Sequence, residues 1–339
     1  MTNEENMARA EARVQRDPGT VVRASLLLLA LLSVVVAGGC GRDAPEGAGD
    51  GAGSGSARDG GIEGAPRVVA SIFPIADLAR SLVPPGVDIL TLLGPATSPA
   101  TFDPTPGAVR DVQRARLLLS VGGGLDAWTG ALLETAPGAR SVTLLEGVPL
   151  RGNGHGEGTG NPHLWLDPIR TRDLLVRRIA DALAETFPAD REGIRERERI
   201  LVDTLTALHD EILRATASLP HRAFVASHAA WTYFAERYDL VQVGVIHEHP
   251  GQETSPRGLV DLVDRARAAD VPVVFSEFQI PDVGARALAG ELGVPVVPLD
   301  PLGGPGVPER DSYPALLRYN TAQLVLGLGR VAPSDGSDP

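Results

Sequence analysis

Short runs of β-branched and other apolar residues alternate along the chain with stretches whose apolar residues recur at helical spacing. The runs cover residues 67–73, 88–94, 115–124 and 141–147, and then 222–228, 240–249, 271–278 and 294–300. Strands that alternate with helical segments are typical of parallel sheets with helical crossovers. Because the two sets of runs match in number and order, the pattern predicts two similar α/β halves.

One long helical segment separates the two sets of runs. Between Ile194 and Ile212 the apolar residues keep roughly helical spacing, and neither glycine nor proline interrupts them. At 1.5 Å per residue, a helix over 191–220 is roughly 40 Å long. We therefore expect an α/β fold of two lobes, each a mainly parallel four-stranded sheet flanked by helices, joined by one long helix. The expected bounds are an N-terminal lobe at 67–189, the linking helix at 190–218 and a C-terminal lobe at 219–331.

The N-terminal region has the features of an export signal. An apolar run over residues 24–40 follows Arg16 and Arg23 and ends in small residues before Cys40. The last four residues resemble a bacterial lipobox, so residues 1–40 are predicted to be a lipoprotein signal peptide, with Cys40 lipidated after cleavage. A plain secretory signal or an uncleaved membrane anchor is the alternative. Residues 41–66, rich in Gly, Ala, Ser and Asp, are expected to form a flexible tether, and 332–339 a polar tail.

Net charge and cysteine content reduce the number of possible functions. The net charge is −12, and no basic patch interleaved with aromatic residues occurs, which argues against nucleic-acid binding. An acidic balance is mildly favourable to a cation ligand. Cys40 is the only cysteine, so an internal disulfide framework is excluded.

Polar residues with metal-ligand chemistry follow several of the predicted strands. In open parallel sheets, ligands bind outside the carboxyl ends of the strands. His163 lies beyond the fourth run, His228 closes the fifth and Asp300 closes the eighth. Two imidazoles and a carboxylate suit zinc, with manganese and iron possible. Each residue also has a purely structural interpretation: a helix cap for His163, a strand-end histidine for His228, and an ordered Asp-Pro turn for Asp300.

Several motifs, taken in order, resemble the solute-binding lipoproteins of zinc and manganese ABC transporters. They are NPHLWLDP (161–168), SHAAWTYFAERYDL (227–240), PGQETSPRGL (250–259), FSEFQ (275–279), LDPLGG (299–304) and RDSYPALLRYN (310–320). The resemblance covers nearly all of residues 67–330. It implies a divalent cation held between two lobes and delivered to a membrane permease by a monomeric, extracytoplasmic, lipid-anchored protein that is not an enzyme. The family's second-lobe ligand is histidine in zinc-type members, so His228 groups this chain with them.

The proline-rich loop TSPATFDPTP (97–106) departs from the family pattern. It resembles the family's first ligand loop, whose usual form is close to SPHTFEPTP, but Ala100 stands where the ligand histidine should be. Asp103 replaces the family's glutamate and is expected to be a loop or helix partner. The resemblance therefore carries His163, His228 and Asp300 over as ligands, and it does not carry over Ala100.

Three groups are candidates for the missing donor. Water is one, since zinc with three protein ligands and water is chemically ordinary. A second is His247 or His249, which alternate with Glu248 and so point the same way in an extended chain. The third is His155, in a glycine-rich segment. Glu277, near the end of the seventh run, is predicted to accept a hydrogen bond from a ligand histidine.

Two other functions compete with metal capture. A zinc hydrolase also holds its metal with three protein ligands and an open position, and Glu277 or Asp103 would be its general base. No HExxH or similar motif supports that interpretation. The other is a relative that has lost metal binding and acts as an adhesin or binds another ligand, for which Ala100 is the only support in the sequence.

Overall fold

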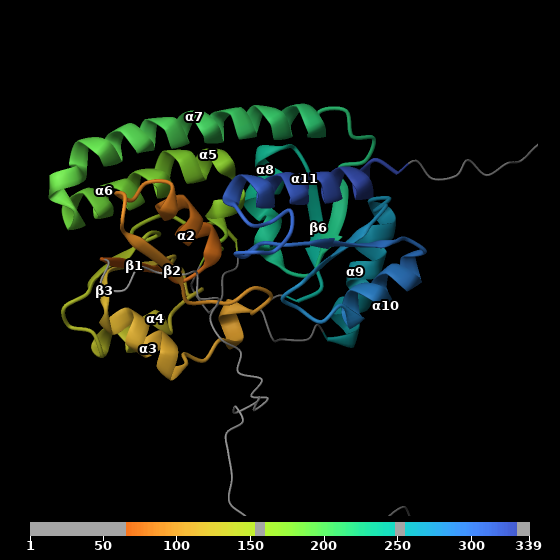
Figure 1. The fold of residues 1–339 in the computed structure, drawn as a ribbon. Helices are drawn as coiled ribbons and strands as arrows, with labels where there is room; N and C mark the ends of the chain where they lie inside the picture. The colour runs from red at the N-terminus through yellow and green to blue at the C-terminus, as the bar shows by residue number, and fades with distance from the viewer. Residues whose placement is uncertain (1–65, 153–159, 248–254, 331–339) are drawn as a thin grey trace, which may run out of the picture. The chain divides into compact units, whose positions relative to one another are not determined.

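The computed structural model describes residues 66–152, 160–247 and 255–330, apart from the side chain of Pro256, and these residues lie in one compact unit, Gly53–Pro339. Residues 1–65, with Cys40, fall outside the described ranges, as do His155, His249 and the tail. The first four strands are β1 (Arg67–Ala70), β2 (Asp88–Thr91), β3 (Ala115–Ser120) and β4 (Arg140–Thr143). They form one parallel sheet in the order β2-β1-β3-β4 (Figure 1).

A second parallel sheet repeats this arrangement. Its strands are β5 (Ala223–Ala226), β6 (Val241–Val245), β7 (Val274–Glu277) and β8 (Val296–Leu299), in the order β6-β5-β7-β8. Seven of the predicted apolar runs contain a whole strand, and the run at 141–147 overlaps β4, which begins one residue earlier, so the expected pair of four-stranded parallel sheets is confirmed. The lobe boundaries proposed from the sequence remain predictions, because the structure joins both sheets in one compact unit.

Helices connect the strands of each sheet and also follow its last strand. In the first half they are α2 (Phe73–Arg80), α3 (Pro106–Gln113), α4 (Thr129–Glu134), α5 (Pro168–Arg170), the π-helical η3 (Thr171–Val176) and α6 (Arg177–Thr186). In the second half they are α8 (Thr232–Arg237), α9 (Pro256–Ala268), α10 (Val283–Leu292) and α11 (Tyr313–Leu328). Short 3-10 turns are η1 (Pro99–Thr101), η2 (Leu164–Leu166), η4 (Pro188–Asp190) and η5 (Ala229–Trp231). No helix in these described ranges is both long and apolar enough to cross a bilayer.

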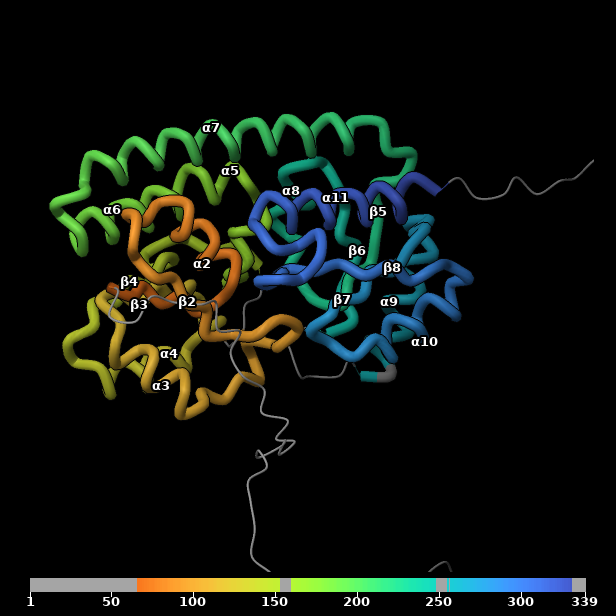
Figure 2. Tube along the Cα trace, viewed as in Figure 1, coloured from red at the N-terminus to blue at the C-terminus, as the bar shows by residue number. Residues whose placement is uncertain are grey.

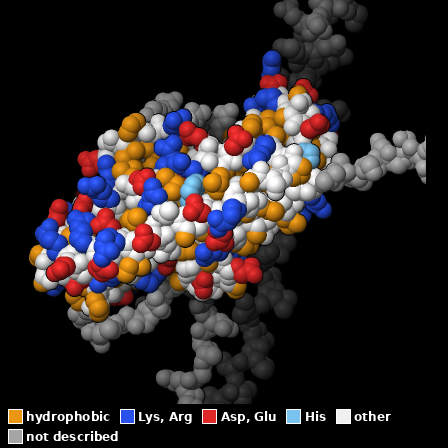
Figure 3. All heavy atoms as spheres, turned by 90° about the horizontal axis from the view of Figure 1, so that it is seen from above, with side chains coloured by type: hydrophobic (Ala, Val, Ile, Leu, Met, Phe, Trp, Pro, Cys, Tyr) orange, Lys and Arg blue, Asp and Glu red, His pale blue; other side chains and the backbone are white. Residues whose placement is uncertain are grey.

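The predicted long helix is α7 (Arg191–Thr216), 26 residues long. It packs against α5 and α6 of the first half and α11 of the second, and the side chains that it buries include Ile194, Leu205, Leu208 and Ile212. Figure 3 shows Arg and acidic side chains interspersed over the face of the molecule on this side. Glu211 of α7 also pairs with Arg318 of α11 at 3.0 Å. The helix is therefore held through its apolar stripe, as its spacing predicted.

The apolar core is continuous between the two halves. One buried cluster includes Leu117 of the first sheet, Trp165 beyond it, and Trp231 and Phe275 in the second half. Trp165 and Trp231 are both 0% exposed, and truncating an aromatic side chain so deeply buried costs about 3–5 kcal/mol. The carboxyl ends of the two sheets are thus fixed against each other by packing, and the polar residues that follow the strands meet there.

Candidate metal site

A small cavity lies where the segments that follow six of the strands meet. The loop after β2 lies beside the segment after β7 in this region (Figure 2). The lining residues are Ser98, Pro99, Leu125, His163, Trp165, His228, Glu277, Gln279, Ile280, Pro301 and Leu302. The space left for the centre of a water-sized sphere is about 20 Å³, enough for one ion or one water molecule.

His163, which precedes η2, is oriented by a neighbouring amide. Asn161 Oδ1 accepts hydrogen bonds from the His163 backbone N–H at 3.0 Å and from Nδ1 at 2.8 Å. The amide oxygen and nitrogen of Asn161 cannot be exchanged, because Nδ2 donates to the carbonyl oxygen of Ala229 and to Thr232 Oγ1. Nδ1 of His163 therefore carries a proton, and Nε2 is directed toward His228.

His228 follows β5 on extended backbone and has a carboxylate behind it. Its Nδ1 lies 2.7 Å from Glu277 Oε2, while Glu277 Oε1 accepts a hydrogen bond of 3.3 Å from Trp231 Nε1. Glu277 is only 3% exposed. This is the position that the sequence suggested for Glu277, and a carboxylate at Nδ1 directs the Nε2 lone pair of a histidine toward a metal.

The two imidazoles face each other across the cavity. His163 Nε2 and His228 Nε2 are 3.2 Å apart, and the ring centroids are separated by 4.9 Å. With acceptors at both Nδ1 atoms, each ring directs its Nε2 at the other, and a shared proton or a shared cation would stabilise this arrangement. Two nitrogens bound to one tetrahedral zinc ion, each at about 2.0–2.1 Å, are about 3.3 Å apart. The pair therefore has the separation of two zinc ligands.

Asp300 does not join this pair. Its Oδ1 accepts hydrogen bonds from Gln279 Nε2 at 2.8 Å and from the backbone N–H groups of Leu302 and Gly303 at 3.0 Å each. Its Oδ2 accepts one from Arg310 Nη1 at 2.9 Å. In the described part of the chain, no three His, Cys, Asp or Glu side chains converge as metal ligands. The set of His163, His228 and Asp300 expected from the sequence is thus not assembled here, because other donors engage the carboxylate.

The remaining sequence candidates that the structure describes lie outside the cavity lining. His247, past the end of β6, donates its backbone N–H to Ser227 O at 2.8 Å, and a Cβ atom added at Gly284 would lie 3.9 Å from its Nε2. Ala100 is exposed in η1, although the two residues before it line the cavity. Asp103 is also exposed, and the residue that caps α3 is Thr105, whose Oγ1 accepts from Ala108 N at 3.2 Å.

The segment that carries His163 is fastened to the second half of the chain. Trp165 Nε1 donates to Pro301 O at 2.7 Å, and the Tyr313 hydroxyl donates to Trp165 O at 2.6 Å. The Tyr233 hydroxyl donates to Asn161 O at 2.8 Å. Because His163 lies between Asn161 and Trp165, these bonds hold it in place against His228.

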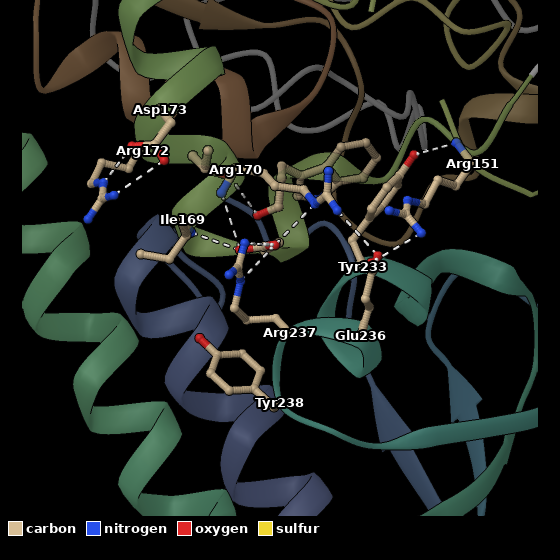
Figure 4. Close-up of polar contacts among 12 residues, drawn as sticks. Arg151, Ile169, Arg170, Arg172, Asp173, Tyr233, Glu236, Arg237 and Tyr238 are labelled. Carbon is tan, nitrogen blue, oxygen red and sulfur yellow. Dashed lines mark hydrogen bonds and ion pairs between the residues drawn. The ribbon is translucent and has the colours of Figure 1, made fainter. Parts of the chain in front are cut away.

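Asp167 completes this attachment by pairing with Arg237, and Figure 4 shows Arg237 of α8 lying close to Ile169 and Arg170 of α5. Its buried carboxylate caps α5 by accepting from the N–H groups of Ile169 and Arg170 at 2.9 and 3.2 Å. It also accepts from Arg237 of α8, through Nε at 3.1 Å and through Nη2 at 3.0 Å. The hydrogen bond to Asp167 raises the pKa of the Arg237 guanidinium. Beside it, Arg170 pairs with Glu236 at 3.2 Å, so two ion pairs tie the helices together.

Three residues around the cavity were missed by sequence reasoning. Asn161 stands two residues before His163, a spacing at which an Asn side chain commonly accepts from the backbone, and this signal could have been used. Gln279 closes the FSEFQ motif, of which only Glu277 was considered. Arg310 opens the RDSYPALLRYN motif, but nothing local indicates that it reaches Asp300.

The fold defines the class of the protein: α/β proteins with two parallel four-stranded sheets whose strands meet at their carboxyl ends. A family model described as "Zinc-uptake complex component A periplasmic" matches residues 68–327. The chain belongs to this family, so the resemblance seen in its motifs is confirmed.

Individual relatives are similar at low identity. Zinc-binding lipoprotein AdcA of Streptococcus pneumoniae serotype 4 is 25% identical over 254 residues, which is 71% of this chain and 50% of AdcA. The chain thus spans about half the length of the AdcA proteins that it matches. The metal ABC transporter substrate-binding lipoprotein ScbA of Streptococcus cristatus is 24% identical over 78% of this chain and 89% of its own length.

Solved structures share the fold. The crystal structure of a ZnuA deletion mutant with zinc bound superimposes with a TM-score of 0.70 and 26% identity, covering 79% of this chain and all of that one. The periplasmic zinc-binding protein TroA from Treponema pallidum gives a TM-score of 0.71 at 24% identity, over 79% of this chain and all of that one. At that identity, TroA supports the fold alone.

Proposed function

We propose that this protein captures a divalent metal ion, with zinc as its main cargo, between His163 and His228 and delivers it to an ABC importer. The observation that carries the proposal is the pair of Nε2 atoms at 3.2 Å, each belonging to an imidazole whose Nδ1 has an acceptor. Two preoriented imidazoles need little rearrangement to bind a cation, so less affinity is lost to ordering. The test is a zinc titration of the parent and its histidine variants, described in the Discussion.

The preference for zinc rests on donor chemistry. Imidazole nitrogen suits zinc, copper, iron and nickel, whereas manganese prefers carboxylate, carbonyl and water oxygens. The two side chains that face each other in the cavity are both imidazoles. The names of AdcA and of the ZnuA structure, which refer to zinc, support the same choice. In this proposal manganese and iron ions bind more weakly than zinc does.

Nothing in the described part of the chain favours a hydrolase at this site. Its candidate base Glu277 is already engaged with His228 and Trp231, and Asp103 is exposed on the loop outside the cavity lining. A general base must reach the bound water that it activates, at about 2.6–3.2 Å or through one further water. Metal capture therefore fits the arrangement better than catalysis does. The adhesin alternative predicts a protein that does not bind zinc, and the same titration tests it.

The location of the protein is proposed from its N-terminal sequence and its relatives' names. Cys40 is expected to be lipidated after cleavage, leaving the metal-binding part outside the cytoplasm on a tether. The relatives AdcA and ScbA are both named as lipoproteins. A Cys40→Ser protein should leave the membrane fraction or stay unprocessed, as judged by fractionation and intact-mass analysis. A soluble mature chain that keeps Cys40 unmodified would contradict the anchor.

Replacing Ala100 in the proline-rich loop with histidine is expected to increase the affinity for zinc. Pro99 lines the cavity and its carbonyl accepts from Trp128 Nε1 at 3.2 Å, so the loop that carries Ala100 is already ordered. Ala100→His should raise zinc affinity by about tenfold, because it adds a neutral imidazole at little cost in entropy. Competition against a chromogenic chelator measures this. If His247 already supplies a donor, Ala100→His should change little while His247→Ala weakens binding.

A further inference from the structure

Gln279 lies in the same cavity as the two histidines. It follows β7 by two residues and lines the cavity together with His163 and His228. Glutamine offers two different groups, an amide nitrogen that only donates and an amide oxygen that only accepts. Which of the two faces the cavity decides whether Gln279 can bind a cation.

The contact with Asp300 fixes this orientation. Gln279 Nε2 lies 2.8 Å from Asp300 Oδ1, and an ionised carboxylate can only accept hydrogen bonds. The NH₂ group must therefore face Asp300, which leaves Oε1 at the opposite edge of the planar amide group, pointing away from Asp300. Gln279 Oε1 is buried and accepts no hydrogen bond from any residue that the structure describes. A buried carbonyl oxygen without a donor is costly, and a cation would satisfy it.

The Asp300 carboxylate is itself held in place, so it can fix the orientation of the Gln279 amide. Besides Gln279, its carboxylate accepts from two backbone N–H groups and from Arg310. The Arg310 guanidinium stacks on the rings of Phe278 and Tyr319, with 4.2 and 4.8 Å to the ring centroids. Arg310 already neutralises the carboxylate, so a metal ion at Asp300 would have to displace a guanidinium held on three sides.

We propose that Gln279 Oε1 is a protein donor to the metal held by His163 and His228, and that Asp300 orients Gln279 instead of binding the metal. This inference rests on the proposed capture of metal by the two histidines. The resulting protein donors are two imidazoles and one amide oxygen, all neutral, with water completing the coordination. Amide oxygens are established ligands of hard divalent cations. A neutral oxygen attracts a cation less strongly than a carboxylate, which favours release to the next carrier.

The test compares Gln279→Leu with a matched control in the full-length protein. Gln242 of β6 is also half-buried, and its Oε1 likewise has no hydrogen-bond partner in the described ranges, but Gln242 does not line the cavity. Gln279→Leu should lower zinc affinity by about tenfold, whereas Gln242→Leu should leave it unchanged. The visible absorption of the Co²⁺-loaded protein should shift in Gln279→Leu only, because these bands depend on the number and kind of donors.

Each outcome decides between the possibilities. Zinc affinity that is unchanged or higher in Gln279→Leu would overturn the proposal, since freeing Asp300 from the amide should help a site in which Asp300 is the ligand. A weaker site with an unchanged Co²⁺ spectrum would also overturn it and give Gln279 a packing role. If His163→Ala also binds zinc like the parent, the proposed function itself fails. Should Gln279→Leu not fold, Gln279→Met keeps the side-chain length and is judged by the same criteria.

Discussion

Replacing either cavity histidine with alanine should weaken zinc binding at least about tenfold, or roughly 1.4 kcal/mol. The two Nε2 atoms are 3.2 Å apart and have the spacing of two ligands of one ion. Losing one imidazole leaves too few protein donors to compete with water for the cation. Isothermal titration calorimetry of His163→Ala and His228→Ala with zinc measures the effect directly.

A histidine at the opposite end of the same sheet provides the control. His221 precedes β5, whereas His228 follows it, and His221 is not among the residues that line the cavity. His221→Ala should bind zinc like the parent. If all three variants bind equally, then neither cavity histidine holds the metal and the site must lie elsewhere.

Asp167→Ala should lower the free energy of unfolding by about 4 kcal/mol. The substitution removes the cap of α5 and leaves the guanidinium of Arg237 without its carboxylate. Removing one partner of a buried pair costs about 3–5 kcal/mol, and losing a helix cap about 1 kcal/mol. The lower end applies here because the Arg237 side chain is 31% exposed, so water replaces part of what is lost. Urea denaturation followed by circular dichroism gives the value.

Asp173 is a suitable comparison because it belongs to η3, the π-helix that directly follows α5. Its side chain is 59% exposed and pairs with Arg172 at 2.7 Å, an arrangement that water screens. Asp173→Ala should change the unfolding free energy by no more than about 0.5 kcal/mol. Equal losses in the two variants would mean that Asp167 contributes no more than a surface ion pair.

The fold could be predicted well from the sequence because the alternation of apolar runs and helical spacing is a local pattern. Each strand is a short apolar run between turn residues, and α7 buries the stripe that its spacing indicated. The ends of the strands were predicted less accurately than their existence. The run at 240–249, for example, contains β6, which stops at Val245. Apolar character alone does not tell where a strand stops pairing with its neighbour.

The site was predicted less completely because side-chain partners come from distant parts of the chain. The rule that ligands lie beyond strand ends brought His163 and His228 together correctly as neighbours, now 3.2 Å apart. The same rule failed to foresee that Asp300 is engaged by Gln279 and Arg310, which are 21 and 10 residues away from it. Spacing identifies groups capable of binding a metal, but it does not reveal which of them are already used by other donors.

The two imidazoles differ in what stands behind them, and this makes them unequal in donor strength. A neutral amide oxygen accepts from His163 Nδ1, whereas an anionic carboxylate lies 2.7 Å from Nδ1 of His228. A carboxylate partner pushes more electron density onto the far nitrogen than an amide does, so His228 should form the shorter and stronger bond to a cation. We therefore expect a departing ion to leave His163 first and to remain briefly on His228, which gives the exit of the metal a direction.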